Sequence, residues 1–292
     1  TWSGVAGGYT ITVTVSNGTC SNTATTTLSV NTVPTAGISL PSPPYCAGVS
    51  INLTGTGGSS YSWASSNSGF VSTTGSSPGW SSLSGGSYSV TVTSGNGTCT
   101  ASATASMSVN SLPNVGITTS TATVCLGTSI NLTATGASSY TWSGTGGSFS
   151  STTNAISSWS GVAGGYTLTV VGDNGTCSNT ATATVSVNGL PNGSITPSSP
   201  TVCSGTSITL TAGGGSTYTW AASGGSFTST TGSPTTWSGV AGGYTITVTV
   251  SNGTCSNTAT TTLSVNTVPT AGISLPPPPY CAGVSINLTG TG

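Results

Sequence analysis

The chain has 292 residues and is almost uncharged, because it contains no Lys, Arg or His and its only acidic residue is Asp173. The lack of basic residues argues against nucleic acids and anionic membrane surfaces as partners. Without an imidazole, an amine or a pair of carboxylates, we expect no enzyme activity, no cofactor and no metal site. No apolar run approaches the roughly 18 residues that a membrane-spanning helix needs.

The sequence is internally repeated. Residues 1–57 and 236–292 differ at one position, where Ser42 becomes Pro277. Weaker copies between them give a period of 78 or 79 residues, which indicates a tandem array of domain-sized units. The first residues fall in the middle of a unit, which suggests a stretch of a longer array. We predict the end of one unit, three complete units and the start of another, over residues 1–32, 33–111, 112–189, 190–267 and 268–292.

The first half of a unit carries two strand patterns. In "SINLTG", Ile51 and Leu53 alternate with polar residues, and in "SYSWAS", Tyr61 and Trp63 share one face. Alternation with a period of two residues predicts β-strands. A lone Phe follows in every complete unit, and a second Trp then precedes a glycine-rich stretch and a Tyr.

The second half of a unit is typical of a β-hairpin. "YSVTVTS" alternates Val90 and Val92 with threonines, and "TASATASMSVN" continues the alternation after a short break. The break, "SGNGTC", contains Asn-Gly, the dipeptide that tolerates positive φ at both central positions of a type I′ turn. We therefore predict two strands joined by a type I′ turn.

These elements together predict the fold class. Five or more short strands per unit, separated by Gly, Ser and Pro and without helical periodicity, indicate an all-β chain of tandem antiparallel β-sandwiches. A "VN-x-x-P" motif marks each joint, where Pro ends one ladder and stiffens the start of the next. This motif runs from Val30 to Pro34, Val109 to Pro113, Val187 to Pro191 and Val265 to Pro269.

The recurring Trp and Tyr residues are the candidate core of each sandwich. A stacking platform for sugars is the alternative, but one Tyr and one Trp on a central strand is what a sandwich core needs. The core prediction covers Tyr61, Trp63, Trp80, Tyr88, Tyr140, Trp142, Trp159, Tyr166, Tyr218, Trp220, Trp237 and Tyr244.

Eight cysteines occur at two per complete unit, without the Cys-x-x-Cys spacing or His that would indicate zinc. We predict disulfides and therefore an oxidising, extracellular or cell-surface location. The candidates are Cys20, Cys46, Cys99, Cys125, Cys177, Cys203, Cys255 and Cys281.

Two disulfide connectivities are open. The cysteines of one unit could pair, as Cys46 with Cys99, Cys125 with Cys177 and Cys203 with Cys255. In a standard sandwich, however, the first would lie at the start of the second strand and the other after the last hairpin turn, at opposite ends of the unit. Cα atoms more than about 7 Å apart cannot be bridged. Pairing across a joint, Cys46 with Cys177 and Cys125 with Cys255, meets this limit if neighbours abut end to end, and we favour it slightly.

Glycosylation motifs of the form Asn-x-Ser/Thr fall into two groups. Those in the Asn-Gly turns are explained by turn geometry, and Asp173 is likewise a turn residue. Asn52, Asn131 and Asn287 point outward from a strand with no turn to make, so these are the candidate sites of sugar attachment.

The combined motifs resemble the immunoglobulin-like or PKD-like repeats of very large secreted surface adhesins of Bacteroidota, including gliding-motility surface proteins. The resemblance covers the entire chain and is carried by "YCAGVSINLTGTGGSSYSWAS", by "GGYTITVTVSNGTCSNTATTTLSVN" and by the Pro at each joint. It implies a β-sandwich unit and a place at the cell surface.

The near-zero net charge indicates how such units behave together. It removes the repulsion that keeps soluble chains apart, and the sandwich edges lack the lysines that commonly block edge pairing. We therefore expect self-association, as a homopolymer or laterally, in a structural extracellular filament or surface fibre. The alternative is an adhesin stalk or a glycan-binding module of a large cell-surface protein, with glycans as partners.

Overall fold

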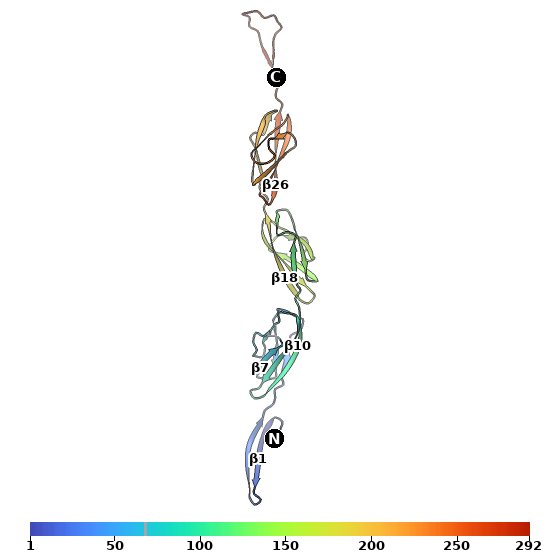
Figure 1. The fold of residues 1–292 in the computed structure, drawn as a ribbon, viewed down its shortest axis with the longest axis vertical. Helices are drawn as coiled ribbons and strands as arrows, with labels where there is room; N and C mark the ends of the chain where they lie inside the picture. Colours follow the sequence, from blue (N-terminus) through green and yellow to red (C-terminus); the bar gives the residue numbers. More distant parts are fainter. Residues whose placement is uncertain (67–68) are drawn as a thin grey trace.

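The structure is a computed structural model that describes residues 1–66 and 69–292. Three β-sandwiches follow one another end to end, with a two-stranded hairpin at the N-terminal end and a short two-stranded segment at the C-terminal end (Figure 1). The described residues include no helix, so none can span a membrane as a helix. The all-β tandem sandwich predicted from the sequence is confirmed.

The unit over residues 112–189 shows the strand arrangement most completely. Its two sheets have the orders β11-β13-β16-β15 and β12-β18-β17-β14. The first strand is split between the sheets, and its second half, β12, runs parallel to the last strand, β18. This is the arrangement of an immunoglobulin-like sandwich. The strands are β11 (Gly116–Thr119), β12 (Thr123–Cys125), β13 (Ile130–Thr135), β14 (Ser139–Gly144), β15 (Ser148–Phe149), β16 (Ile156–Ser160), β17 (Gly164–Asp173) and β18 (Ser178–Asn188).

The unit over residues 190–267 repeats this topology. Its sheets have the orders β19-β21-β24-β23 and β20-β26-β25-β22, and β20 runs parallel to β26. The strands are β19 (Ser194–Pro197), β20 (Thr201–Cys203), β21 (Ser207–Gly213), β22 (Thr217–Ala222), β23 (Ser226–Phe227), β24 (Thr235–Ser238), β25 (Gly242–Ser251) and β26 (Ser256–Asn266).

The unit over residues 33–111 keeps one sheet intact, β4-β10-β9-β7, and has the other divided into the pairs β3-β6 and β5-β8. Pro78 explains the division, because it stands where the next unit has Ser157, opposite Leu132 in the ladder. Proline has no N–H to donate, so it interrupts a central ladder. The strands are β3 (Gly37–Ser39), β4 (Tyr45–Cys46), β5 (Ile51–Asn52), β6 (Thr54–Thr56), β7 (Ser60–Ser65), β8 (Gly79–Trp80), β9 (Gly86–Gly95) and β10 (Thr100–Asn110).

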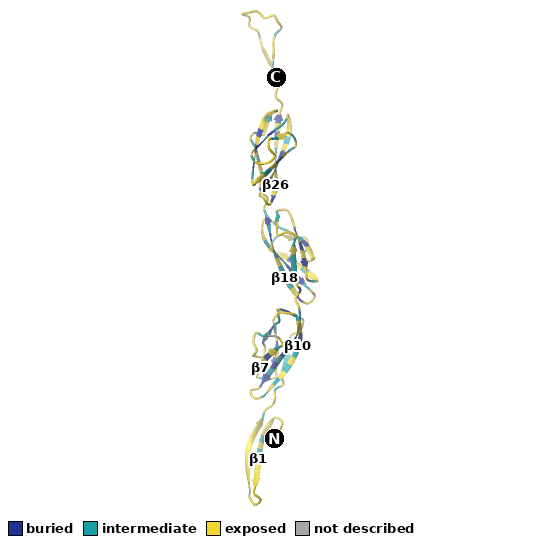
Figure 2. Ribbon diagram, viewed as in Figure 1, coloured by how far each residue is buried: buried dark blue, intermediate teal, exposed yellow. Residues whose placement is uncertain are grey.

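A two-stranded segment lies at each end of the chain. At the N-terminal end, β1 (Gly7–Ser16) and β2 (Ser21–Val30) form a hairpin. At the C-terminal end, β27 (Gly272–Ser274) pairs with β28 (Thr289–Thr291). The hairpin is largely exposed, whereas buried residues concentrate inside the three complete units (Figure 2).

Each complete unit has its own core between its two sheets. In residues 112–189 the core includes Ile130, Leu132 and Leu168, all fully buried. All six predicted Trp residues of the complete units are buried, and so is Tyr88. The other predicted aromatics are half-buried: Tyr61, Tyr140, Tyr166, Tyr218 and Tyr244.

One tyrosine of each unit has a more specific role than core packing. The Tyr166 hydroxyl donates a hydrogen bond to the Val162 carbonyl oxygen at 2.9 Å, and Tyr244 does the same to Val240 at 2.9 Å. These tyrosines lie near the start of β17 and β25. A tyrosine at this place whose hydroxyl group bonds back to the preceding corner is the tyrosine corner of immunoglobulin-like sandwiches. It fixes the crossing between the two sheets, and our sequence analysis assigned these tyrosines only to the core.

The hairpin turn differs from the prediction. Four residues, Asn96 to Cys99, separate paired Gly95 and Thr100, and among described residues none but glycine has a positive φ. The type I′ prediction is therefore wrong, although the hairpin itself is present. The Asn96 side-chain oxygen accepts hydrogen bonds from the N–H groups of Thr98 and Cys99, and Gly97 takes the positive φ of 94°. The turn is longer because the Asn side chain organises it.

Candidate functional site: the stapled joint between units

The joints between complete units bring sequence-distant cysteines together. Cys46 is bonded to Cys177 with a Cα–Cα distance of 5.9 Å, and Cys125 is bonded to Cys255 at 5.7 Å. Each bond therefore joins one unit to the next, which is the pairing across the joint. The pairing within a unit does not occur in the structure.

The strand topology explains why these cysteines meet. Cys125 ends the short strand β12 in register with Asn188, the last residue of β18, so it lies where the chain leaves its unit. Cys177 follows the turn between β17 and β18, at the other end of the same unit. The expectation that the two cysteines of a unit occupy opposite ends is met. The first one, however, lies on the edge strand parallel to the last strand, not at the start of the second strand.

Asparagine side chains support each joint beside its disulfide. The Asn179 side-chain amide donates to the Pro113 carbonyl oxygen at 3.0 Å, and Asn257 donates to that of Pro191 at 3.2 Å. Both prolines are buried, so the linker lies against the last hairpin of the unit that it enters. Asn174, in the turn itself, donates to the Ser111 carbonyl oxygen at 3.4 Å.

Sequence reasoning missed the role of Asn179 and Asn257. The available signal was the repeated "CSNTAT". Its Asn lies on the inward face of the strand, which it shares with the alanines that follow at every second position. In residues 33–111 the same stretch is "CTASAT", with Ala101 at this place. An Asn at an inward position indicates a hydrogen-bond partner, because a buried amide without one is unfavourable.

Four cysteines are free: Cys20, Cys99, Cys203 and Cys281. Two of them, Cys99 and Cys203, lie in complete units at positions equivalent to those of bonded cysteines. The Cys99 sulfur is 3.9 Å from the Asn31 carbonyl oxygen, much as the bonded Cys255 sulfur is 4.0 Å from that of Asn188. Cys203 is in register with Asn266 at the end of β26. Free and bonded cysteines thus occupy equivalent places.

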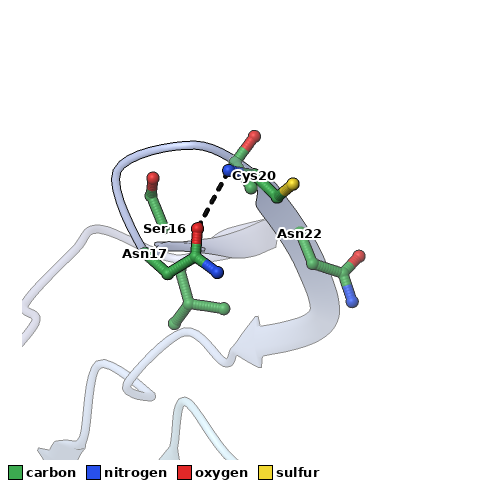
Figure 3. Close-up of a pocket in the computed structure, with 6 residues that line it drawn as sticks. Ser16, Asn17, Cys20 and Asn22 are labelled. Atoms are coloured by element: carbon green, nitrogen blue, oxygen red, sulfur yellow. Dashed lines mark hydrogen bonds between the residues drawn. The ribbon is translucent and has the colours of Figure 1, made fainter.

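The turn that carries the second cysteine is open to solvent where no neighbour covers it. Figure 3 shows this turn at the end of the N-terminal hairpin, where the Asn17 side-chain oxygen accepts a hydrogen bond from the Cys20 N–H at 2.9 Å. Cys20 is exposed there, whereas Cys177 and Cys255 are each only 2% exposed. The turn cysteine is therefore buried where a neighbouring unit is bonded to it.

The predicted glycosylation sites lie on the surface. Asn52, Asn131 and Asn287 are exposed, and sugar attachment to them stays a prediction. Among the described residues, no group of three or more His, Cys, Asp or Glu side chains could hold a metal ion. Shallow hollows beside the joints are lined mainly by glycine and serine, with Leu126 and Val162 in one unit and Val240 and Tyr244 in the next.

Comparisons with known proteins return solved structures alone. No protein-family model matches the sequence, and no curated protein matches it. The chain is similar to an eight-domain fragment of Down Syndrome Cell Adhesion Molecule, with 17% identity over 88% of this chain and 46% of that chain and a TM-score of 0.33. It is also similar to an I-band fragment of titin (15%, 81% and 99%, TM-score 0.34) and to the bacterial integrin-binding protein invasin (16%, 82% and 62%, TM-score 0.28). The chain spans about half the length of the first of these.

Proposed function

We propose that the chain is a load-bearing stretch of an extracellular filament or surface fibre, non-catalytic and built from tandem immunoglobulin-like units. The observation that carries this proposal is the pair of disulfides across consecutive joints, Cys46–Cys177 and Cys125–Cys255. Disulfides persist in oxidising compartments, which supports a location outside the cell or at its surface. A purely adhesive module has no need to bond each unit to the next.

The staples change the mechanics of the joints. Units connected by one short linker are expected to move relative to one another, since relative motion is the default for small interfaces. Here each joint between two complete units has two covalent connections, the linker and the disulfide, together with the Asn179 or Asn257 hydrogen bond to the linker. Two separate attachment points remove most bending directions, so the row of units behaves as a rod.

The staples also stabilise the folded units. Each closes a loop of about 130 residues, with sequence separations of 131 and 130. On the chain-entropy model, a loop of this length destabilises the unfolded state by about 5 kcal/mol. The benefit is shared between two units, because each loop begins in one unit and ends in the next.

Electron microscopy of native, unreduced material tests the proposal. We expect continuous filaments with an axial repeat of about 30 to 45 Å, the length of one sandwich. Treatment with a reductant should make them more flexible, and a matched sample treated with the oxidised form of the same reagent should stay straight. Dispersed, flexible strings of beads before reduction would contradict the fibre and favour the adhesin stalk.

A further inference from the structure

We propose that the staples, the disulfides Cys46–Cys177 and Cys125–Cys255, keep the array in one piece after its backbone has been cut, so that a protease must cleave three separate segments to sever it between Cys46 and Cys255. This property goes beyond bearing load, because it concerns an array whose peptide chain is no longer continuous. It follows from the order of the four bonded cysteines along the chain.

The two disulfides are connected by three different stretches of peptide. Cys46 and Cys177 form one junction, and Cys125 and Cys255 form the next. Because the loops overlap, residues 46–125, 125–177 and 177–255 each run from one junction to the other. These three stretches lie in parallel as covalent connections, although they follow one another in sequence.

The number of cuts that separates the junctions follows directly. One cut between Cys46 and Cys255 leaves two parallel connections, and two cuts in different stretches leave one. Only a cut in each of the three stretches separates the two junctions. A single-linker array separates at the first cut, and pairing within units gives a different pattern of fragments.

The chain offers an unusually clean way to place such cuts. It contains no Lys or Arg, so trypsin has no site in it and one introduced Arg creates one site. The loops before β9, β17 and β25 are equivalent and each carries an exposed apolar residue. These residues are Leu83, Val162 and Val240, which are 94%, 70% and 71% exposed. One of them lies in each parallel stretch. The substitutions change side chains alone and keep the backbone carbonyl oxygens that accept the hydrogen bonds of the tyrosine corner. We therefore expect the Arg variants to fold.

The experiment compares seven variants: Leu83→Arg, Val162→Arg and Val240→Arg singly, in pairs and together. Free thiols are alkylated first, which prevents exchange, and the denatured protein is then digested with trypsin without reductant. We expect every single and double variant to run as one molecule until it is reduced, when it separates into the fragments of complete cleavage.

The triple variant decides the connectivity. We expect it to give two disulfide-linked products without reductant, residues 1–83 bonded to 163–240 and residues 84–162 bonded to 241–292. Pairing within units would instead hold all four fragments together, so a single product from the fully cut triple variant would overturn the proposal. So would separation of any single or double variant before reduction.

A matched control shows that cleavage outside the staples is visible. Thr32→Arg places the site before Cys46, at an exposed residue that is followed by Val33 and not by Pro. Trypsin should then release residues 1–32 without reductant, since Cys20 is free. These outcomes do not depend on filament formation, so failure here and failure of the proposed fibre are distinguished.

Discussion

Trp2 and Trp237 are equivalent residues of the nearly identical stretches 1–57 and 236–292, yet Trp237 is 1% exposed and Trp2 is 47% exposed. Each makes an edge-to-face contact with the tyrosine seven residues later, with ring centroids 4.5 Å apart for Trp2 and Tyr9 and 4.8 Å for Trp237 and Tyr244. The local contact is therefore the same in both copies. The difference comes from the strands β19 to β22, which enclose Trp237 and have no counterpart around Trp2.

This contrast gives a test of where the stability of a unit arises. Trp237→Ala should lower the free energy of unfolding of residues 190–267 by about 3 to 5 kcal/mol, because it empties a closed core. Trp2→Ala should change the stability of the complete units by less than about 0.5 kcal/mol. Hydrogen exchange followed by mass spectrometry would measure both. Equal effects of the two substitutions would show that the local pair, and not the enclosed core, stabilises the unit.

A count of free thiols checks the disulfide pattern. A maleimide added to the denatured, unreduced chain should label four cysteines, Cys20, Cys99, Cys203 and Cys281, and should label all eight after reduction. Pairing within the three complete units would leave two labelled. As a control, Cys46→Ser should expose Cys177 and give five labels from seven cysteines.

The strand pattern of each unit could be predicted from sequence because burial follows a period of two. Val90 and Val92, which alternate with threonines, are fully buried on β9. The division of one sheet in the same unit was not foreseen, because the effect of Pro78 depends on which residue lies opposite it. That register is a property of the folded sheet and not of the local pattern.

The joint was only partly predictable for a similar reason. Spacing located the cysteines but left two pairings open, since the choice depends on which end of the unit each cysteine occupies. The structure resolves this through the parallel pairing of β12 with β18, which places Cys125 beside Asn188. Short edge strands such as β12 carry too few residues to show a period.

The tyrosine corner gives a prediction for a single hydroxyl group. Tyr166→Phe removes the hydrogen bond to the Val162 carbonyl oxygen but keeps the ring packed on Trp159, with centroids 4.7 Å apart. We expect a loss of about 0.5 to 1.5 kcal/mol in the unfolding free energy of residues 112–189. Thr182→Val, which removes an exposed hydroxyl group on β18, should change it by less than about 0.5 kcal/mol. Urea unfolding of both variants with the disulfides intact would measure the difference, and equal midpoints would contradict a stabilising corner.

Force spectroscopy tests how the parallel stretches limit extension. In the oxidised chain the shortest connection between the two disulfides is the 52 residues from Cys125 to Cys177, or about 180 Å when fully extended. In the reduced chain the connection from Cys46 to Cys255 is 209 residues, or about 700 Å. Reduction should therefore add about 500 Å to the fully unfolded length between these two points.

The single-staple variant Cys125→Ser separates the contributions of the two disulfides. With only Cys46 bonded to Cys177, the shortest connection from Cys46 to Cys255 becomes the 78 residues that follow Cys177, or about 270 Å. An intermediate length shows that each disulfide shortens the chain by bypassing its own loop. Pairing within units would also leave 52 residues in the oxidised chain, so the variant decides between the two pairings. With pairing within units, Cys125→Ser would leave the 104 residues from Cys99 to Cys203, or about 350 Å, and this length would contradict bonds across the joints.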